Sequence, residues 1–194
     1  MAVKIGGQTV KVSSGGGKVM SPAMYPARLV LAVYLGTQEN QDYNTKEMVD
    51  EDTFLFTFEF PTELVEYNGE EKPRWLSRSV KISDFEKSNF YKICNALKPG
   101  YSPEKDDPFE MVNSPCMVTT GLTKTGKARI MDVNPAVSGF PIPDLVNEPV
   151  VFNVKAPDMA AFMKLPEWLQ NICVKNKDFE GSDLQLLLDE ENNS

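Results

Sequence analysis

Apolar and polar residues alternate along several stretches of this chain, and a period of two is typical of a β-strand with one face buried. The clearest case is TFLFTFEFP at 53–61, in which every second residue is a phenylalanine. A second strand is predicted over residues 27–35, where alternate positions are aliphatic. We expect the phenylalanine face to pack in a core against these aliphatic residues: Leu29, Leu31, Val33 and Leu35.

Further elements follow from the same patterns. A third strand is predicted from about Arg74 to Ile82, after a turn at YNGEEKP, and residues 38–52 are predicted as a polar loop. Ser88 is a typical N-cap for a helix over NFYKICNALK, which Pro99-Gly100 ends. Two strands are expected around a tight turn near 124–127, another strand in VNEPVVFNV, and a second helix over 159–174.

Three strands, a helix and a two-stranded hairpin are the element order of the OB-fold, a five-stranded barrel that binds oligonucleotides. We therefore predict a mainly β fold, an OB-like five-stranded barrel with a helix between strands three and four, followed by a C-terminal helix and an acidic tail. The Gly- and Ser-rich residues 1–23 are expected to form a flexible arm, with a short hairpin in KIGGQTVKV. Residues 24–175 would be the OB-like domain, and residues 176–194 a disordered tail.

Composition narrows the function classes. The chain has 194 residues, of which 41% are hydrophobic and 25% charged, as in ordinary globular proteins. It has no apolar run long enough for a membrane span and no signal-peptide segment at its start, so a cytosolic protein is expected. Histidine is absent, which excludes Ser–His and Cys–His nucleophilic sites. Three widely spaced cysteines predict reduced thiols rather than a disulfide framework.

The net charge of −8 is unevenly distributed. Most of it comes from the six acids after Lys177, a segment that contains no basic residue. Residues 1–28 contain four basic residues and no acid, and residues 72–98 contain seven basic residues against two acids. Residues 1–177 thus carry a net charge of only about −2, and a basic middle with an acidic end differs from a uniformly acidic surface. This distribution keeps a nucleic-acid partner in consideration.

GLTKTGKA at 121–128 nearly matches the phosphate-binding loop G-x-x-x-x-G-K-[ST], but Ala128 replaces the hydroxyl residue that would reach magnesium. The motif also needs a helix after it, whereas ARIMDV continues as a strand. A nucleotide-metabolising enzyme is therefore the least favoured hypothesis. We interpret the segment as a hairpin tip that carries lysines, at the place where OB-folds use their last hairpin loop to contact a strand.

Basic residues interleaved with aromatic ones are the positive signal for function. Proteins hold single strands through cationic grooves and through rings on which bases stack. PRWLSRSVKI places Trp75 among basic residues on one strand, where it alternates with Ser77, Ser79 and Lys81. Tyr34 lies on the polar face of the first strand. The alternative is a solvated strand face with one tryptophan packed at its edge. The candidate single-stranded-DNA-binding residues are Arg28, Tyr34, Arg74, Trp75, Arg78, Lys81, Lys124, Lys127 and Arg129.

The C-terminal sequence DLQLLLDEE frames apolar residues with acids. An acidic end is often only solubilising, but this one is also suited to docking in a basic groove of a partner. Tethered to a DNA-binding body, it could also compete weakly with DNA. The candidate partner-binding residues are Asp183, Leu186, Leu187, Leu188, Asp189, Glu190 and Glu191.

Together these segments resemble a bacteriophage family of single-stranded-DNA-binding proteins. The resemblance is carried by MYPARLVLAVYLGTQ (24–38), FEFPTEL (58–64), EKSNFYKICNAL (86–97), SPCMVTTGLTKTGKARIMDVNPA (114–136), FPIPD (140–144) and LPEWLQNI (165–172). It implies a non-enzymatic OB-fold protein in the cytoplasm of the host bacterium that binds single strands with little sequence preference during replication or recombination, with no cofactor or metal. It also implies an acidic tail that contacts the replication machinery.

Two departures from that family stand out. The acidic segment 39–52 is long, and the chain ends NNS rather than in the proline and phenylalanine of bacterial-type tails. Homo-oligomerisation is compatible with the sequence. The main alternative is an accessory or anti-defence protein whose acidic surface engages a host DNA-binding protein.

Overall fold

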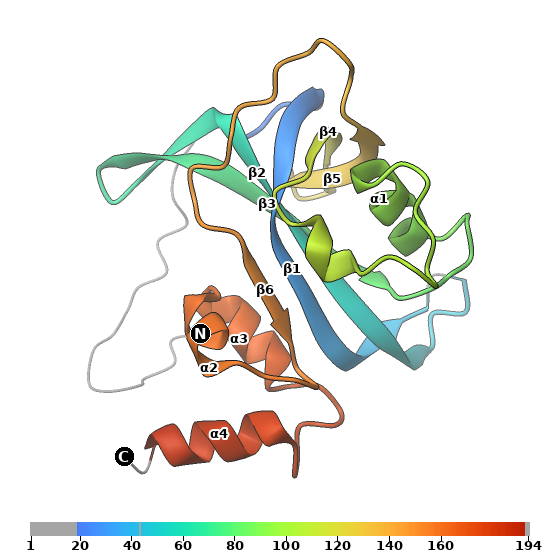
Figure 1. The fold of residues 1–194 in the computed structure, drawn as a ribbon, viewed down its shortest axis with the longest axis vertical. Helices are drawn as coiled ribbons and strands as arrows, with labels where there is room; N and C mark the ends of the chain where they lie inside the picture. Colours follow the sequence, from blue (N-terminus) through green and yellow to red (C-terminus); the bar gives the residue numbers. More distant parts are fainter. Residues whose placement is uncertain (1–18, 43, 193–194) are drawn as a thin grey trace.

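The computed structural model describes residues 19–42 and 44–192, so most of the predicted N-terminal arm lies outside the described residues. The fold is mainly β. Its strands are β1 (Met24–Gln41), β2 (Met48–Tyr67), β3 (Glu70–Lys81), β4 (Pro115–Leu122), β5 (Ala128–Pro135) and β6 (Val150–Asn153). The hydrogen-bonded order is β3-β2-β1-β4-β5, all antiparallel, and β6 pairs with β1 in parallel (Figure 1).

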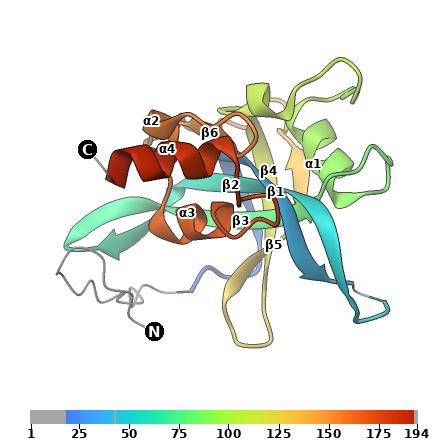
Figure 2. The ribbon, with the colours of Figure 1, turned by 90° about the horizontal axis from the view of Figure 1, so that it is seen from below.

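The helices are short and lie on both sides of the sheet (Figures 1 and 2). Helix α1 (Asn89–Leu97) and the 3-10 helix η1 (Pro108–Met111) join β3 to β4. Helices α2 (Met159–Lys164), α3 (Glu167–Cys173) and α4 (Asp183–Asn192) follow β6. None of the helices in the described parts of the chain is long and apolar enough to cross a membrane.

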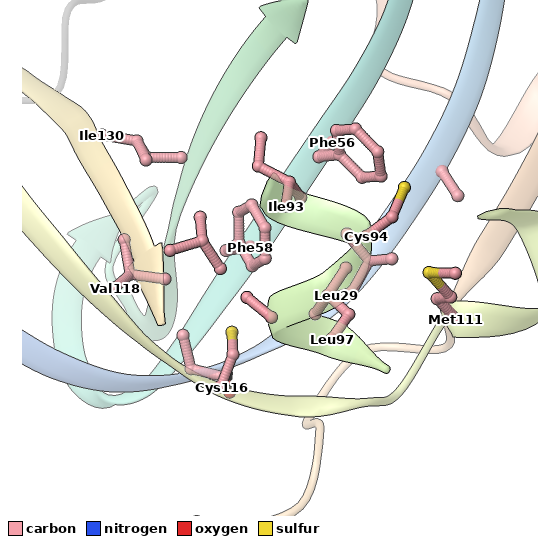
Figure 3. Packing of buried hydrophobic residues seen from close by; sticks show 14 of the residues in the cluster. Leu29, Phe56, Phe58, Ile93, Cys94, Leu97, Met111, Cys116, Val118 and Ile130 are labelled. Atoms are coloured by element: carbon pink, nitrogen blue, oxygen red, sulfur yellow. Dashed lines mark hydrogen bonds between the residues drawn. The ribbon is translucent and has the colours of Figure 1, made fainter. Parts of the chain in front are cut away.

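The α1 core lies between the phenylalanine face of β2 and helix α1. Ser88 caps α1 as predicted, since its hydroxyl accepts a hydrogen bond from the Tyr91 amide at 3.0 Å. The side chains of Phe56 and Phe58 point toward Ile93 in this core (Figure 3). All four phenylalanines of β2 are buried. The prediction that Phe54, Phe56 and Phe58 are core residues is confirmed, and Phe60, whose role the sequence left open, belongs to the core as well.

A β-bulge corrects the predicted partner of that face. Leu29 lies opposite Phe58, but Leu31 lies opposite Thr57, so Val30 is an extra residue on β1. Because side chains alternate with a period of two, one extra residue moves all the later ones to the other face. Only Leu29 of the predicted aliphatic face therefore meets the phenylalanines. The other three residues belong to a separate core: Leu31, Val33 and Leu35.

This second core, the C-terminal core, packs β6 and helices α2 to α4 against the opposite face of β1 and β2. Both Leu55 of β2 and Leu169 of α3 are almost completely buried in it. The chain reaches it through a crossing loop, residues 136–149, which runs from β5 over the end of the sheet to β6 (Figure 1). Central strands buried on both faces explain why polar residues are so few in 29–35 and 54–60.

The predicted OB-like five-stranded barrel is only partly reproduced. The sheet has six strands, and within the described residues no backbone ladder joins β3 to β5. The two strands nevertheless approach each other, and Arg78 Nη1 of β3 donates to the carbonyl oxygen of Met131 on β5 at 3.0 Å. We call this side-chain-bridged approach of β3 and β5 the seam.

Three local predictions need correction. The predicted loop 38–52 is mostly strand, because the β1–β2 ladder continues to the pair Gln41–Met48. The predicted helix 159–174 is two helices separated at Leu165–Pro166, since proline disfavours a helical conformation in the residue before it. The segment predicted as a disordered tail contains α4, whose Leu184 is fully buried in the C-terminal core.

Candidate nucleic-acid interface

The β4–β5 hairpin projects from the body of the protein (Figure 2) and presents three candidate cations: Lys124, Lys127 and Arg129. All three residues are exposed, and none of them forms a salt bridge with the residues that the structure describes. A hydrogen bond from the Thr123 amide to the Lys127 carbonyl at 2.8 Å closes the turn, and Gly126 supplies a φ of 78°. Since β5 follows the turn directly, the near match to a phosphate-binding loop is a hairpin tip without the required helix.

Strand β3 separates its candidate residues onto two faces. Arg74 and Arg78 lie opposite Phe60 and Phe56, and so belong to the face of the α1 core. Arg78 is half-buried and reaches the seam, while Arg74 makes contacts of its own. The other face carries Trp75, Ser77, Ser79 and Lys81 in alternation, as the sequence predicted.

Trp75 is tied to a buried carboxylate that the sequence analysis missed. Glu59 of β2 is completely buried, and its carboxylate accepts hydrogen bonds from Trp75 Nε1 at 2.9 Å, the Val146 amide at 2.6 Å and Asn147 Nδ2 at 2.6 Å. Three donors compensate for the loss of water around the charge. The indole is half-buried beside the C-terminal core, so its position is set by the fold and only part of it faces solvent.

Arg28 lies in the same row across the sheet, since Arg28 pairs with Glu59 and Glu59 pairs with Trp75. Its guanidinium donates to the carbonyl oxygens of Pro143, Asn113 and Ile142 at 2.8, 2.8 and 3.1 Å, and lies 3.2 Å from the Asp144 carboxylate. Arg28 and Glu59 together hold the crossing loop over this row. The Arg28 side chain, 16% exposed, is therefore largely committed to protein acceptors rather than available to a phosphate.

Tyr34 and Lys81 lie at the other end of the sheet, about 20 Å from Arg28 at roughly 3.3 Å per residue along β1. The Tyr34 hydroxyl donates to Asp52 at 2.8 Å, and the Lys155 ammonium lies 5.4 Å from the centre of its ring. Partial burial raises the pKa of Tyr34. Lys81 pairs with Glu51 at 3.0 Å. The candidate residues thus form two groups. One group lies on β3 and the β4–β5 hairpin, and the other, with its contacts already made within the protein, consists of Arg28, Tyr34 and Lys81.

The C-terminal segment docks on the protein's own body. Lys177 donates its amide to the Thr37 carbonyl at 2.9 Å and pairs with Glu39 and Asp50 at 2.8 and 3.3 Å. Beyond it, Leu184 is buried and Leu188 packs partly against the C-terminal core, while Leu186 is 56% exposed. Of the candidate partner-binding residues, Leu188 is thus partly used internally. The acidic residues of α4 are exposed.

Glu59 could have been suspected from the sequence, because it is the one charged residue inside the apolar run 54–60. Nothing local indicates its partners, however, since Val146 and Asn147 lie almost 90 residues away in the chain. Lys155, which contacts Tyr34, was missed for the same reason. In the described residues no group of three acidic or cysteine side chains is arranged to hold a metal ion.

Comparison with protein-family models, with curated proteins and with solved structures finds no match to this chain.

Proposed function

We propose that this chain is a non-enzymatic protein that binds single-stranded DNA with little sequence preference, in phage replication or recombination, through an OB-like barrel. The observation that carries the proposal is the β4–β5 hairpin. Its three cations are exposed and unpaired in the described structure, next to the strand that holds Arg78 and Trp75. Exposed cations without carboxylate partners are the groups that exchange salt ions for phosphates.

The order of elements supports the barrel part of the proposal. The path β3-β2-β1-β4-β5 brings its two end strands together at the seam, and α1 connects β3 to β4 across the apolar interior. An OB-fold is a partly open barrel of this kind, whose second and third strands and last hairpin loop contact oligonucleotides. In this chain the corresponding parts would be the face of β3 that carries Trp75, Ser77 and Ser79, and the β4–β5 hairpin.

The strand would meet phosphate-binding side chains on the hairpin and at the seam, namely Lys124, Lys127, Arg129 and Arg78. The exposed part of the Trp75 ring, followed along β3 by the small side chains of Ser77 and Ser79, is the surface on which a base could stack. Arg28 then serves the fold by holding the crossing loop, and Tyr34 is peripheral.

The test is the fluorescence anisotropy of a labelled oligo-dT strand, titrated at several salt concentrations and compared with a duplex. Replacing Lys124 and Lys127 together by glutamine should weaken binding and reduce the salt slope by about 1.4, since each phosphate contact to a single strand contributes about 0.7. Lys175→Gln, at an exposed lysine after α3, is the matched control and should change neither. Failure of the wild-type protein to bind oligo-dT at low salt would refute the proposal.

One observation favours the alternative, a protein-interaction module. The ends of β2 and β3 form an arm, residues 61–73, that extends beyond the sheet (Figure 1) and carries exposed Leu64 and Tyr67 among four glutamates. An acidic arm with apolar residues fits a basic protein partner better than DNA. Capture of a basic host DNA-binding protein that is lost when Leu64 and Tyr67 are replaced by serine, without any binding to oligo-dT, would select this function.

A further inference from the structure

The seam between β3 and β5 is the place where the sheet is left without a backbone ladder in the described structure. The β4–β5 ladder contains an irregularity, since Thr119 pairs with Asp132 but Thr120 pairs with Ile130. Met131 is the extra residue, and its carbonyl oxygen accepts the hydrogen bond from Arg78. A bulge of this kind bends the strand locally and increases its twist, and it lies where the guanidinium of Arg78 joins β5 to β3.

Arg78 uses only part of its hydrogen-bonding capacity in this bridge. A guanidinium has five N–H donors in a planar fork, and one of them reaches Met131. Arg78 makes no other hydrogen bond within the described residues, and no polar side-chain atom in that part of the chain is buried without a partner. The remaining donors of Arg78 therefore face solvent at the seam, in the geometry that matches a phosphate.

A second positive charge lies on β5, near the residue that Arg78 contacts. Arg129, two residues before Met131 on β5, is exposed and has no carboxylate partner in the described structure. Burial and, to a smaller extent, the positive charge of Arg129 lower the pKa of Arg78. Asp132 is the one acid that acts on Arg78 in the opposite direction. Two guanidinium groups and one carboxylate leave a net positive charge at the seam. Like charges held together in this way are stabilised when an anion binds between them.

We propose that the β3–β5 seam is a phosphate-binding site, in which one phosphate of a nucleic-acid strand is held between Arg78 and Arg129 and so links the two strands that lack a backbone ladder. The inference deepens the proposed function and rests on it for the source of the phosphate. A ligand bound to both strands stabilises the folded state by mass action, because the site does not exist in the unfolded chain. Binding at the seam is thereby coupled to the stability of the barrel.

Inorganic pyrophosphate is the probe, titrated into the full chain at constant ionic strength while thermal unfolding is followed. It should raise the melting temperature of the wild-type protein. Arg129→Gln, which leaves the Arg78–Met131 bond in place, should weaken pyrophosphate binding about tenfold, the loss expected for one charge-assisted hydrogen bond. Arg78→Lys keeps the charge but loses the fork, and should do the same. Lys175→Gln should bind as the wild type does.

The same variants are titrated with oligo-dT, where each arginine substitution should also weaken binding. Pyrophosphate binding that survives both arginine substitutions overturns the seam site, even if oligo-dT binds normally. Pyrophosphate binding that is weakened only by the Lys124 and Lys127 substitutions also overturns it, because the ligand then lies at the hairpin tip. Pyrophosphate binding that needs both arginines, in a protein that does not bind oligo-dT, supports the site and refutes only the proposed function.

Discussion

Replacing Glu59 by glutamine tests the most buried polar contact of the sheet. The carboxylate is 0% exposed, and one of its oxygens, Oε2, accepts from both Trp75 and Asn147, while Oε1 accepts from the Val146 amide. Glutamine supplies a single acceptor oxygen. If that oxygen takes the Oε2 position, the new NH2 group faces the Val146 N–H, so one donor is left without an acceptor.

The expected loss of stability follows from these contacts. A hydrogen bond to a charged group contributes about 1.5–3 kcal/mol, and a buried donor without a partner costs about 1–3 kcal/mol, so Glu59→Gln should lower the free energy of unfolding by about 2–3 kcal/mol. Urea unfolding followed by tryptophan fluorescence measures the change, and in a Trp168→Phe background, where Trp75 is the remaining tryptophan, the signal reports on Trp75. The fluorescence of the folded variant should shift as well, because the indole loses its charged partner.

The matched control is Glu66→Gln, on the same strand but exposed and opposite Glu71. It should change the stability by less than about 0.5 kcal/mol. Equal effects of the two substitutions would refute the reasoning, since they would mean that Glu59 is not buried among donors. The same holds for an unchanged folded-state fluorescence of Glu59→Gln.

Three further predictions concern the C-terminal helix, the thiols and the surface charges. Leu184→Ala should lower the free energy of unfolding by about 2 kcal/mol and make the C-terminal segment sensitive to limited proteolysis. Leu186→Ala, at an exposed position of the same helix, should change neither property much. Equal proteolysis of the two variants would contradict the docking of α4. Burial raises the pKa of Cys94 and of Cys173 to about 12 and that of Cys116 even further. A thiol reagent at neutral pH should therefore label the protein only after denaturant unfolds it. Rapid labelling of the native protein would contradict the burial of these residues. The hydrogen bond from Lys98 holds the pKa of Asp106 below its usual value of 3.8. The stability that this pair contributes is therefore present above that pH and is lost as the pH falls through the lowered pKa. An NMR titration should find that Lys98→Met moves the Asp106 pKa upward, and an unchanged pKa would show that the pair does not form in solution.

Local patterns predicted much of the fold. The phenylalanine face of β2, the Ser88 cap of α1, the β4–β5 hairpin and the strand β6 were all predicted from the sequence, because each depends on residues that are neighbours in the chain. The alternation of β3, with Trp75 on the face opposite Arg78, was also predicted correctly. Of the candidate site, the exposure of the hairpin cations could be predicted for the same reason.

Tertiary structure decided the contacts between distant segments. The extra residue at Val30 leaves no mark in the alternation of aliphatic residues, because β1 is buried on both faces and an apolar residue suits either one. Arg28 and Glu59 find partners in a crossing loop more than 80 residues away, and Trp75 finds its partner, Glu59, on the neighbouring strand. The docking of Leu184 depends on a core built by β1, β6 and α3. Periodicity determines which residues of one strand share a face. Which other segment covers that face depends on register, bulges and loop closure, and these are properties of the whole folded chain.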